Sequence, residues 1–127
     1  MADIGQLVLE AHTRLFDQHD TSVLDEYFAE DFVEHSPLIA DDAAGLRAFV
    51  EDLSESLKYT NARVITDTAN HLVALHGQFE GIEETPFVGF DIYRVHDGKI
   101  VEHWDNLVPE AAPNPSGRTP VSYTHLT

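Results

Sequence analysis

The sequence contains no cysteine, few basic residues and no long apolar run. The absence of cysteine excludes disulfide bonds and thiolate chemistry. No apolar stretch approaches the roughly 20 residues that a membrane-spanning helix needs. The first residues also lack the basic-then-apolar layout of a signal peptide. We therefore expect a cytoplasmic protein that does not associate with membranes.

Positive charge is scarce. Seven Lys and Arg residues oppose 23 Asp and Glu residues, and the formal net charge is −16. Such a surface repels nucleic-acid phosphates and anionic lipids. The acidic residues are spread along the chain rather than collected into one block, which is typical of a solubilising surface. A nucleic-acid partner is therefore not expected.

Several catalytic motifs are missing as well. The sequence has no Gly-x-Gly-x-x-Gly fingerprint, no phosphate-binding loop and no Gly-x-Ser-x-Gly elbow. Hydride transfer, phosphoryl transfer and serine-hydrolase chemistry thus lack their usual residues. Proton transfer remains, as does hydrolysis by an activated water, in either case on a small and fairly apolar molecule.

The first half of the chain has helical periodicity. Apolar residues recur at helical spacing over residues 3–18, and Thr21 or Ser22 can cap a short helix ending near residue 28. Residues 31–35 form a brief extended piece, which Ser36-Pro37 ends. Asp41 or Asp42 then caps a third helix, whose buried side extends to Leu57.

The second half of the chain has strand periodicity. Strands are predicted over residues 62–68, 71–79, 87–95 and 99–107, and an Asp-Gly turn joins the last two. Helices followed by an antiparallel sheet indicate one α+β domain over residues 1–127. A curved sheet that closes over the helices would form a cone with a pocket inside. Residues 108–127 are predicted to be an extended tail.

The stretch from Asp97 to Asp105 carries the most information about function. On a strand, His103 and Asp105 share one face, while Glu102 and Trp104 share the other. If Trp104 packs in the core, His103 and Asp105 face water. If the sheet is concave and a second subunit covers its outer face, the pair faces the pocket. A carboxylate in an apolar pocket has a raised pKa and can act as a general acid or base.

Asp91 is the second candidate carboxylate. It lies between Phe90 and Ile92 in the middle of a predicted strand, where an acidic residue is locally unfavourable. It either pairs with Arg94 or Lys99, or faces the pocket beside Asp105. In the second case, the two carboxylates would raise the pKa of one of them.

Further polar residues are candidates for substrate contacts. His76 ends an apolar run, and His35 lies where the short extended piece breaks, at the expected rim of a pocket. Tyr27 and Tyr59 can donate hydrogen bonds to a ligand, although core packing is the commoner role of tyrosine. The three histidines His35, His76 and His103 show no close metal-ligand spacing, so no metal site is predicted.

Three stretches of the chain resemble the SnoaL-like polyketide cyclase group of the NTF2-like superfamily. They are Phe32-Val33-Glu34-His35-Ser36-Pro37, Asp91-Ile92-Tyr93-Arg94-Val95 and Asp97-Gly98-Lys99-Ile100-Val101-Glu102-His103-Trp104-Asp105. The resemblance implies a cone-shaped α+β barrel, commonly a homodimer through the sheet. It also implies that Asp105 corresponds to the acid/base aspartate of these cyclases, which close a ring by an aldol step without metal or organic cofactor.

The resemblance suggests a full set of site residues. Asp105, His103 and Asp91 would be catalytic, and His35, His76, Tyr27 and Trp104 would contact a small hydrophobic carbonyl compound. Two other functions stay open: Asp105 and Asp91 could activate a water, as in an epoxide hydrolase, or the domain could bind a ligand without catalysis. The last residues, 122–127, do not resemble the family's tail and are expected to be non-native.

Overall fold

The computed structural model describes residues 3–40, 42–110 and 115–121. Within these residues, two helices, a strand and a third helix are followed by four further strands, which confirms the predicted α+β class. The helices are α1 (Ile4–Phe16), α2 (Val23–Glu26) and α3 (Ala43–Asp52). The strands are β1 (Phe28–Glu34), β2 (Lys58–Asp67), β3 (Leu72–Glu80), β4 (Phe87–His96) and β5 (Lys99–Pro109).

Helices α1 and α3 begin at side-chain caps, whereas Ser22, which precedes α2, makes no capping hydrogen bond. The Asp3 side chain accepts a hydrogen bond from the Gly5 amide at the start of α1. The Asp42 side chain accepts one from the Gly45 amide and so caps α3, as predicted; the alternative cap, Asp41, lies outside the described residues. Helix α3 ends at Asp52, earlier than predicted. Leu57 is nevertheless fully buried, because the chain turns back into the core just before β2.

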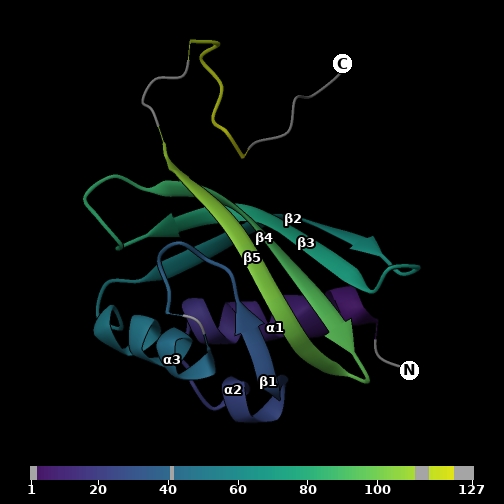
Figure 1. Cartoon of the computed structure of the whole chain (residues 1–127). Coiled ribbons are helices and arrows are strands. Elements are labelled where there is room, and N and C mark those ends of the chain that lie inside the picture. Colours follow the sequence, from purple (N-terminus) through teal and green to yellow (C-terminus); the bar gives the residue numbers. More distant parts are fainter. Residues whose placement is uncertain (1–2, 41, 111–114, 122–127) are drawn as a thin grey trace.

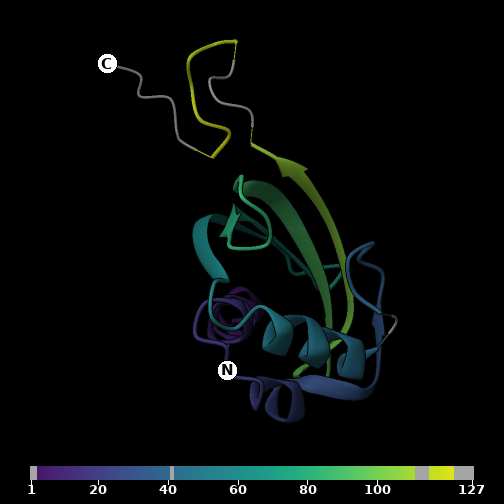
Figure 2. The ribbon, with the colours of Figure 1, turned by 90° about the vertical axis from the view of Figure 1, so that its left-hand side faces the viewer.

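All five strands form one mixed sheet in the order β1-β5-β4-β3-β2. Strand β1 runs parallel to β5, and the other neighbours are antiparallel. The β4–β5 hairpin turns through Asp97 and Gly98, both with positive φ angles (50° and 74°), as expected for an Asp-Gly turn of this kind. The sheet curves over the helices, which lie on its concave side (Figures 1 and 2).

A bulge in β5 decides which side chains face the helices. Arg94 pairs with Glu102 while Val95 pairs with Ile100, so Val101 is an extra residue without a partner in β4. This extra residue lets Ile100 and His103, an odd number of positions apart, both be buried on the concave side. Without it, strict alternation from Ile100 would turn His103 to the outside.

The concave side of the sheet and the helices enclose a single hydrophobic core. Val8, Ala11 and Leu15 form the buried stripe of α1, and Val73, Leu75 and Phe79 of β3 face the same core. No helix among the described residues is long and apolar enough to cross a membrane. Of the predicted tail, the first residues continue β5 to Pro109, and residues 111–114 and 122–127 lie outside the described part of the chain.

Substitution of two glycines, Gly77 and Gly89, tests how tightly this core is packed. Gly77 and Gly89 lie opposite each other on β3 and β4. A Cβ atom on Gly77 would clash with the Tyr59 hydroxyl and lie 2.6 Å from the Thr60 carbonyl oxygen, whereas one on Gly89 would meet first the end of the flexible Leu107 side chain. Gly77→Ala should therefore lower the free energy of unfolding by about 1–3 kcal/mol, and Gly89→Ala by less. Urea denaturation measures both, and equal losses would contradict this packing.

Candidate functional site

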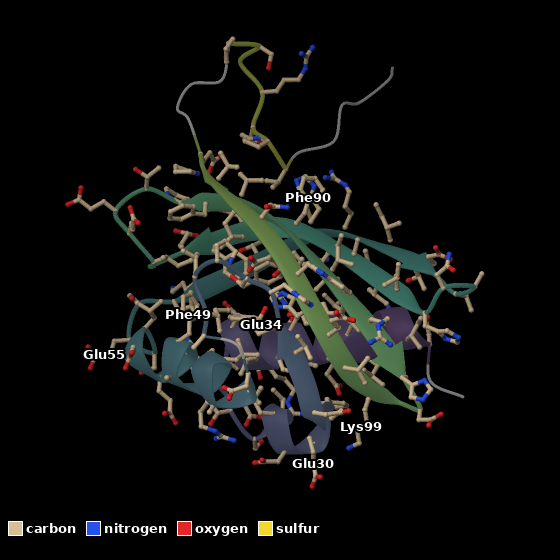
Figure 3. The ribbon with its side chains drawn as sticks, viewed as in Figure 1. Glu30, Glu34, Phe49, Glu55, Phe90 and Lys99 are labelled. Atoms are coloured by element: carbon tan, nitrogen blue, oxygen red, sulfur yellow. The ribbon has the colours of Figure 1, made fainter. Side chains whose placement is uncertain are left out.

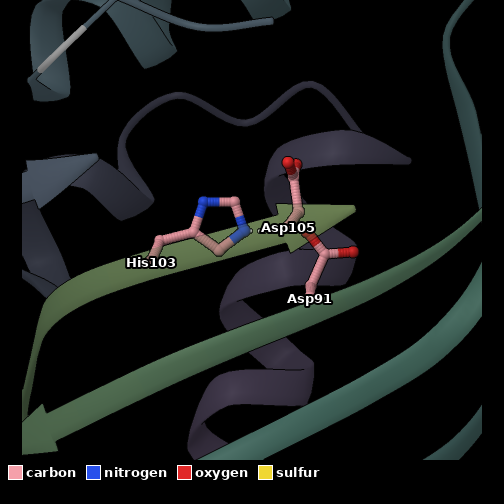
Figure 4. A group of neighbouring side chains, drawn as sticks. All are labelled: Asp91, His103 and Asp105. Atoms are coloured by element: carbon pink, nitrogen blue, oxygen red, sulfur yellow. Dashed lines mark hydrogen bonds and ion pairs between the residues drawn. The ribbon is translucent and has the colours of Figure 1, made fainter. Parts of the chain in front are cut away.

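The candidate site lies on the concave face of the β4–β5 hairpin. Asp91 and Asp105 are direct partners across the two strands, and His103 precedes Asp105 by two residues on the same face. All three side chains rise from the sheet on the side of the helices (Figure 4). Their exposed fractions are 1% for Asp91, 0% for His103 and 8% for Asp105. Of the two orientations left open by the sequence, the structure thus has the inward one.

His103 is held between two buried carboxylates. Its Nδ1 lies 2.7 Å from a Glu34 oxygen, and its Nε2 lies 2.7 Å from Asp91 Oδ1. The Tyr93 ring stacks on the imidazole at 4.4 Å. Burial alone would lower the pKa of His103, but the hydrogen bonds to Asp91 and Glu34 outweigh it and raise that pKa to about 10. His103 is therefore an imidazolium at neutral pH, with both N–H groups donated.

Asp105 has the properties of a proton-transfer group. Burial, and to a smaller extent the nearby Asp91 charge, raise the pKa of its carboxyl to about 6. The positive His103 and the Ser36 hydroxyl oppose this rise but do not cancel it. Its Oδ1 atom has no hydrogen-bond partner. A carboxyl group with a pKa close to neutral can both take up and release a proton under physiological conditions.

Asp105 opens onto a very small cavity of about 10 Å³, barely enough for one water molecule. Apart from Asp105 and Ser36, its wall is apolar. The wall residues are Phe16, Leu38, Ile39, Phe49, Phe79, Ile82 and Leu107. Leu38 and Ile39 lie on the connection between β1 and α3, and Ile82 lies between β3 and β4. A larger ligand needs these connections to move outward.

Two of the predicted substrate contacts lie on the opposite side of the sheet. The His35 ring stacks on the Trp104 ring at 5.1 Å, and His35 Nε2 hydrogen-bonds Glu102 at 2.7 Å. Glu102 and Trp104 alternate with His103 and Asp105, so this group belongs to the outer face. The sequence prediction required His35 and Trp104 to line the cavity beside Asp105. They do not, because both lie on the outer face.

His76 and Tyr27 also lie away from the cavity. His76 is buried on the outer face, where its ring stacks on Phe90 and contacts the Arg63 guanidinium; burial and this positive charge lower its pKa. The Tyr27 hydroxyl donates a hydrogen bond to Glu10 at the surface. The prediction placed His76 on the wrong side, since Val73, Leu75 and Phe79 are the inward residues of β3.

Two buried members of the site, Glu34 and His12, were not predicted. Glu34 lies two residues after the buried Phe32 on β1, so strand alternation marks it as inward. His12 lies one turn after Val8 on the buried stripe of α1. Its Nδ1 is 2.6 Å from the Tyr93 hydroxyl oxygen. The local periodicity could have found both residues. Figure 3 shows Glu34 on the helix side of the sheet and Phe90 on the other.

The site offers little to a metal ion. Asp91, His103 and Asp105 each present one possible ligand atom, all within 4.8 Å of one another. His103, however, already donates both ring N–H groups to carboxylates, and its pKa of about 10 keeps it protonated. An imidazolium has no lone pair for a metal. His35 and His76, the other members of the three-histidine set, lie on the opposite face.

More than half of the amino-acid sequence matches the model of a known family. Residues 9–103 match the SnoaL-like domain. The chain belongs to this family. The predicted resemblance to the SnoaL-like group is thereby confirmed. Among curated proteins none matches the sequence significantly.

Solved structures share the same fold. TsrD from Streptomyces laurentii superposes with a TM-score of 0.68 at 18% identity, covering 84% of this chain and 91% of that one. Wild-type IdmH from Streptomyces antibioticus, described as a candidate polyketide cyclase, gives 0.67 at 22% identity, covering 84% and 92%. An LEH-like epoxide hydrolase of M. tuberculosis gives 0.64 at 15%, covering 83% and 82%. At these identities the likeness establishes the fold alone.

The charged cluster makes stability depend on pH. The pKa of His103 is about 10 in the folded state and about 6.5 in an unfolded chain. Between these values the folded state holds a proton that the unfolded chain releases, so stability must fall as pH rises, by up to about 1.4 kcal/mol per pH unit. Urea denaturation from pH 6.5 to 10 measures this fall.

Two variants separate this effect from the rest of the chain. Glu34→Gln removes one of the two carboxylates and should lower the pKa of His103, so the fall in stability should end at a lower pH. His35→Gln changes a histidine on the outer face and should leave the fall unchanged. A wild-type stability that is flat or rising between pH 6.5 and 10 would disprove the imidazolium assignment.

Proposed function

We propose that the protein is a cofactor-independent enzyme in which Asp105 acts as general acid/base on a small apolar carbonyl compound. The observation that carries this proposal is the Asp105 carboxyl, which is 8% exposed, has a pKa raised to about 6 and lines an apolar cavity. Such a group can remove the proton next to a carbonyl and return it elsewhere on the product. The step would be an aldol-type cyclisation or condensation, or an isomerisation.

Asp91 and His103 have supporting roles in this proposal. His103 donates both N–H groups to carboxylates, so it is not free to donate to a substrate. It compensates the charge of Asp91, whose carboxylate would otherwise raise the pKa of Asp105 further. Asp91 and His103 thus set the proton affinity of Asp105 rather than transfer the proton themselves.

Substitution of Asp105 tests the proposal directly. We expect wild-type protein to accelerate exchange of the α-protons of 2-tetralone in deuterium oxide, followed by proton NMR. Asp105→Asn should lower this rate by about 100-fold or more, because general acid/base catalysis contributes 10²–10⁴-fold. Glu102→Gln, a carboxylate change on the outer face of the same strand, should have no effect.

The pH profile of the wild-type protein and the stability of Asp105→Asn test the role of Asp105 in two further ways. Since the base form of Asp105 abstracts the proton, kcat/KM should rise as pH passes about 6. Asp105→Asn should also raise the melting temperature, because it removes a desolvated charge. Full activity in Asp105→Asn would reject the catalytic role, and a lower melting temperature without loss of activity would make the residue structural.

Two other functions have an observation in their favour. Room for about one water beside Asp105, with Asp91 opposite, favours activation of a water as in an epoxide hydrolase. Formation of a diol from styrene oxide, lost in Asp105→Asn, would select that reaction. The small cavity volume also favours a ligand-binding domain without catalysis. If neither reaction is observed but a small ligand binds, the domain is a ligand-binding domain without catalysis.

We also propose that two copies pair through the outer face of the sheet. Phe90, Ile92 and Val108 are 51%, 38% and 62% exposed there, and Ile65 is 58% exposed. Exposed apolar groups on one face are typical of an interface. The acidic Glu102 on this face is paired with Arg94 and His35, so it does not oppose the approach of a second copy.

A cytoplasmic location remains a prediction from the sequence.

A charge in the centre of this face should separate the two copies. We expect light scattering to give the mass of a dimer for the wild type and that of a monomer for Phe90→Asp, because a buried unpaired carboxylate is costly. Phe90→Leu keeps an apolar side chain and should remain dimeric. A wild-type protein that is monomeric at micromolar concentration would refute the interface.

A further inference from the structure

Three buried side-chain atoms of the site lack a hydrogen-bond partner: His12 Nε2, Asp91 Oδ2 and Asp105 Oδ1. Among the described residues they are the only buried side-chain nitrogen or oxygen atoms in this condition. Their residues are 1%, 1% and 8% exposed. An unsatisfied buried polar atom costs roughly 1–3 kcal/mol, so three in one place call for an explanation.

The three atoms belong to one small region. His12 Nε2 lies 3.8 Å from Asp91 Oδ2, which is too long for a direct hydrogen bond. The Asp91 and Asp105 side chains approach each other to within 4.8 Å. Two atoms that share one bridging oxygen, each at about 2.8 Å, lie roughly 3.5–5 Å apart. The gap between His12 and Asp91, with Asp105 directly opposite Asp91 on the hairpin, therefore points to one bound oxygen atom shared by the three groups.

The hydrogen positions follow from the neighbours. Burial lowers the pKa of His12 to about 4 and raises that of Tyr93 well above its usual value, so the imidazole is neutral and the phenol keeps its proton. The Tyr93 hydroxyl lies 2.6 Å from His12 Nδ1. We infer that it donates its hydrogen to that nitrogen and that the His12 proton is on Nε2, because the Asp91 carboxylate lies 3.8 Å from Nε2 and favours a proton there. The region thus offers one N–H donor and two carboxylate acceptors.

We propose that His12 Nε2, Asp91 Oδ2 and Asp105 Oδ1 bind the hydroxyl oxygen of a small, neutral, apolar ligand. A hydroxyl group accepts a hydrogen bond from His12 and donates one to a carboxylate. A ligand carboxylate or phenolate is rejected, because it would meet two like charges. A ketone can accept from His12 but donates nothing, so it binds less well than an enol or a phenol.

This inference deepens the proposed function and rests on it for the direction of entry, through the cavity at Asp105. There the ligand's apolar body would lie against Phe16 and Phe79, once Leu38 and Ile82 move outward. When Asp105 takes up the α-proton it becomes neutral, so the oxygen that turns from carbonyl into enolate no longer meets two like charges. The His12 N–H and the new Asp105 O–H can then stabilise the charge that develops on it.

Phenol and toluene test the site, because they have nearly the same size and differ in the hydroxyl group. Calorimetric titration at pH 7.5, where phenol is neutral, should show phenol binding at least about tenfold tighter than toluene, as two net hydrogen bonds would give. In His12→Phe the preference should fall to about onefold to threefold, with toluene binding retained. His35→Phe, a matched change on the outer face, should keep the full preference.

A measurement on the wild-type protein keeps the test valid if His12→Phe fails to fold. Nitrogen NMR should show His12 neutral, with its proton on Nε2, and phenol but not toluene should shift this Nε2–H signal. Binding of phenol no tighter than toluene, binding of neither, or a proton on Nδ1 would each overturn the site.

The outcome is independent of turnover. If phenol binds more tightly than toluene but 2-tetralone protons do not exchange, the oxygen site is supported and the proposed enzyme is rejected. If exchange depends on Asp105 but phenol binds no more tightly than toluene, the proposed enzyme is supported and this oxygen site is rejected.

Discussion

The ion-paired hydrogen bonds of His103 with Glu34 and Asp91 are the interaction on which the site depends. They join three strands, since Glu34 is on β1, Asp91 on β4 and His103 on β5. Each of these side chains is almost fully buried, so loss of one partner would leave a charge without compensation in the core. Removal of one member of a buried pair is strongly destabilising. The cluster therefore fixes the sheet edge and the local charge together.

This arrangement explains why Asp105 differs chemically from Asp91. Both are inward and directly opposite each other on the hairpin. One Asp91 oxygen receives the His103 N–H, whereas the Asp105 carboxyl borders the cavity and is the more exposed of the two. Unlike surroundings of this kind allow one carboxyl of a neighbouring pair to have a pKa close to neutral, as Asp105 does.

The two faces of the sheet have separate tasks in the resulting picture. The concave face carries the acid cluster and the small cavity, and the outer face carries exposed apolar residues such as Phe90 and Val108. The histidines are divided in the same way. His12 and His103 belong to the cluster, whereas His35 and His76 stack on aromatic rings of the outer face. The proposed activity and the proposed pairing of two copies therefore rest on different side chains.

The sequence by itself determined the order of the helices and strands but not all of their ends. It also determined the Asp-Gly hairpin and the placement of His103 and Asp105 on one face, because these follow from local periodicity and turn chemistry. Only the tertiary structure decided which face is inward and which histidines belong to the site. One reason is that Trp104 and Asp105 are adjacent on β5 and must face opposite sides, and the sequence does not say which of them is buried. The other is that the bulge at Val101 shifts the inward–outward alternation of the side chains along β5. The partnership of His103 with Glu34, 69 residues away, likewise exists only because β1 adds in parallel to β5.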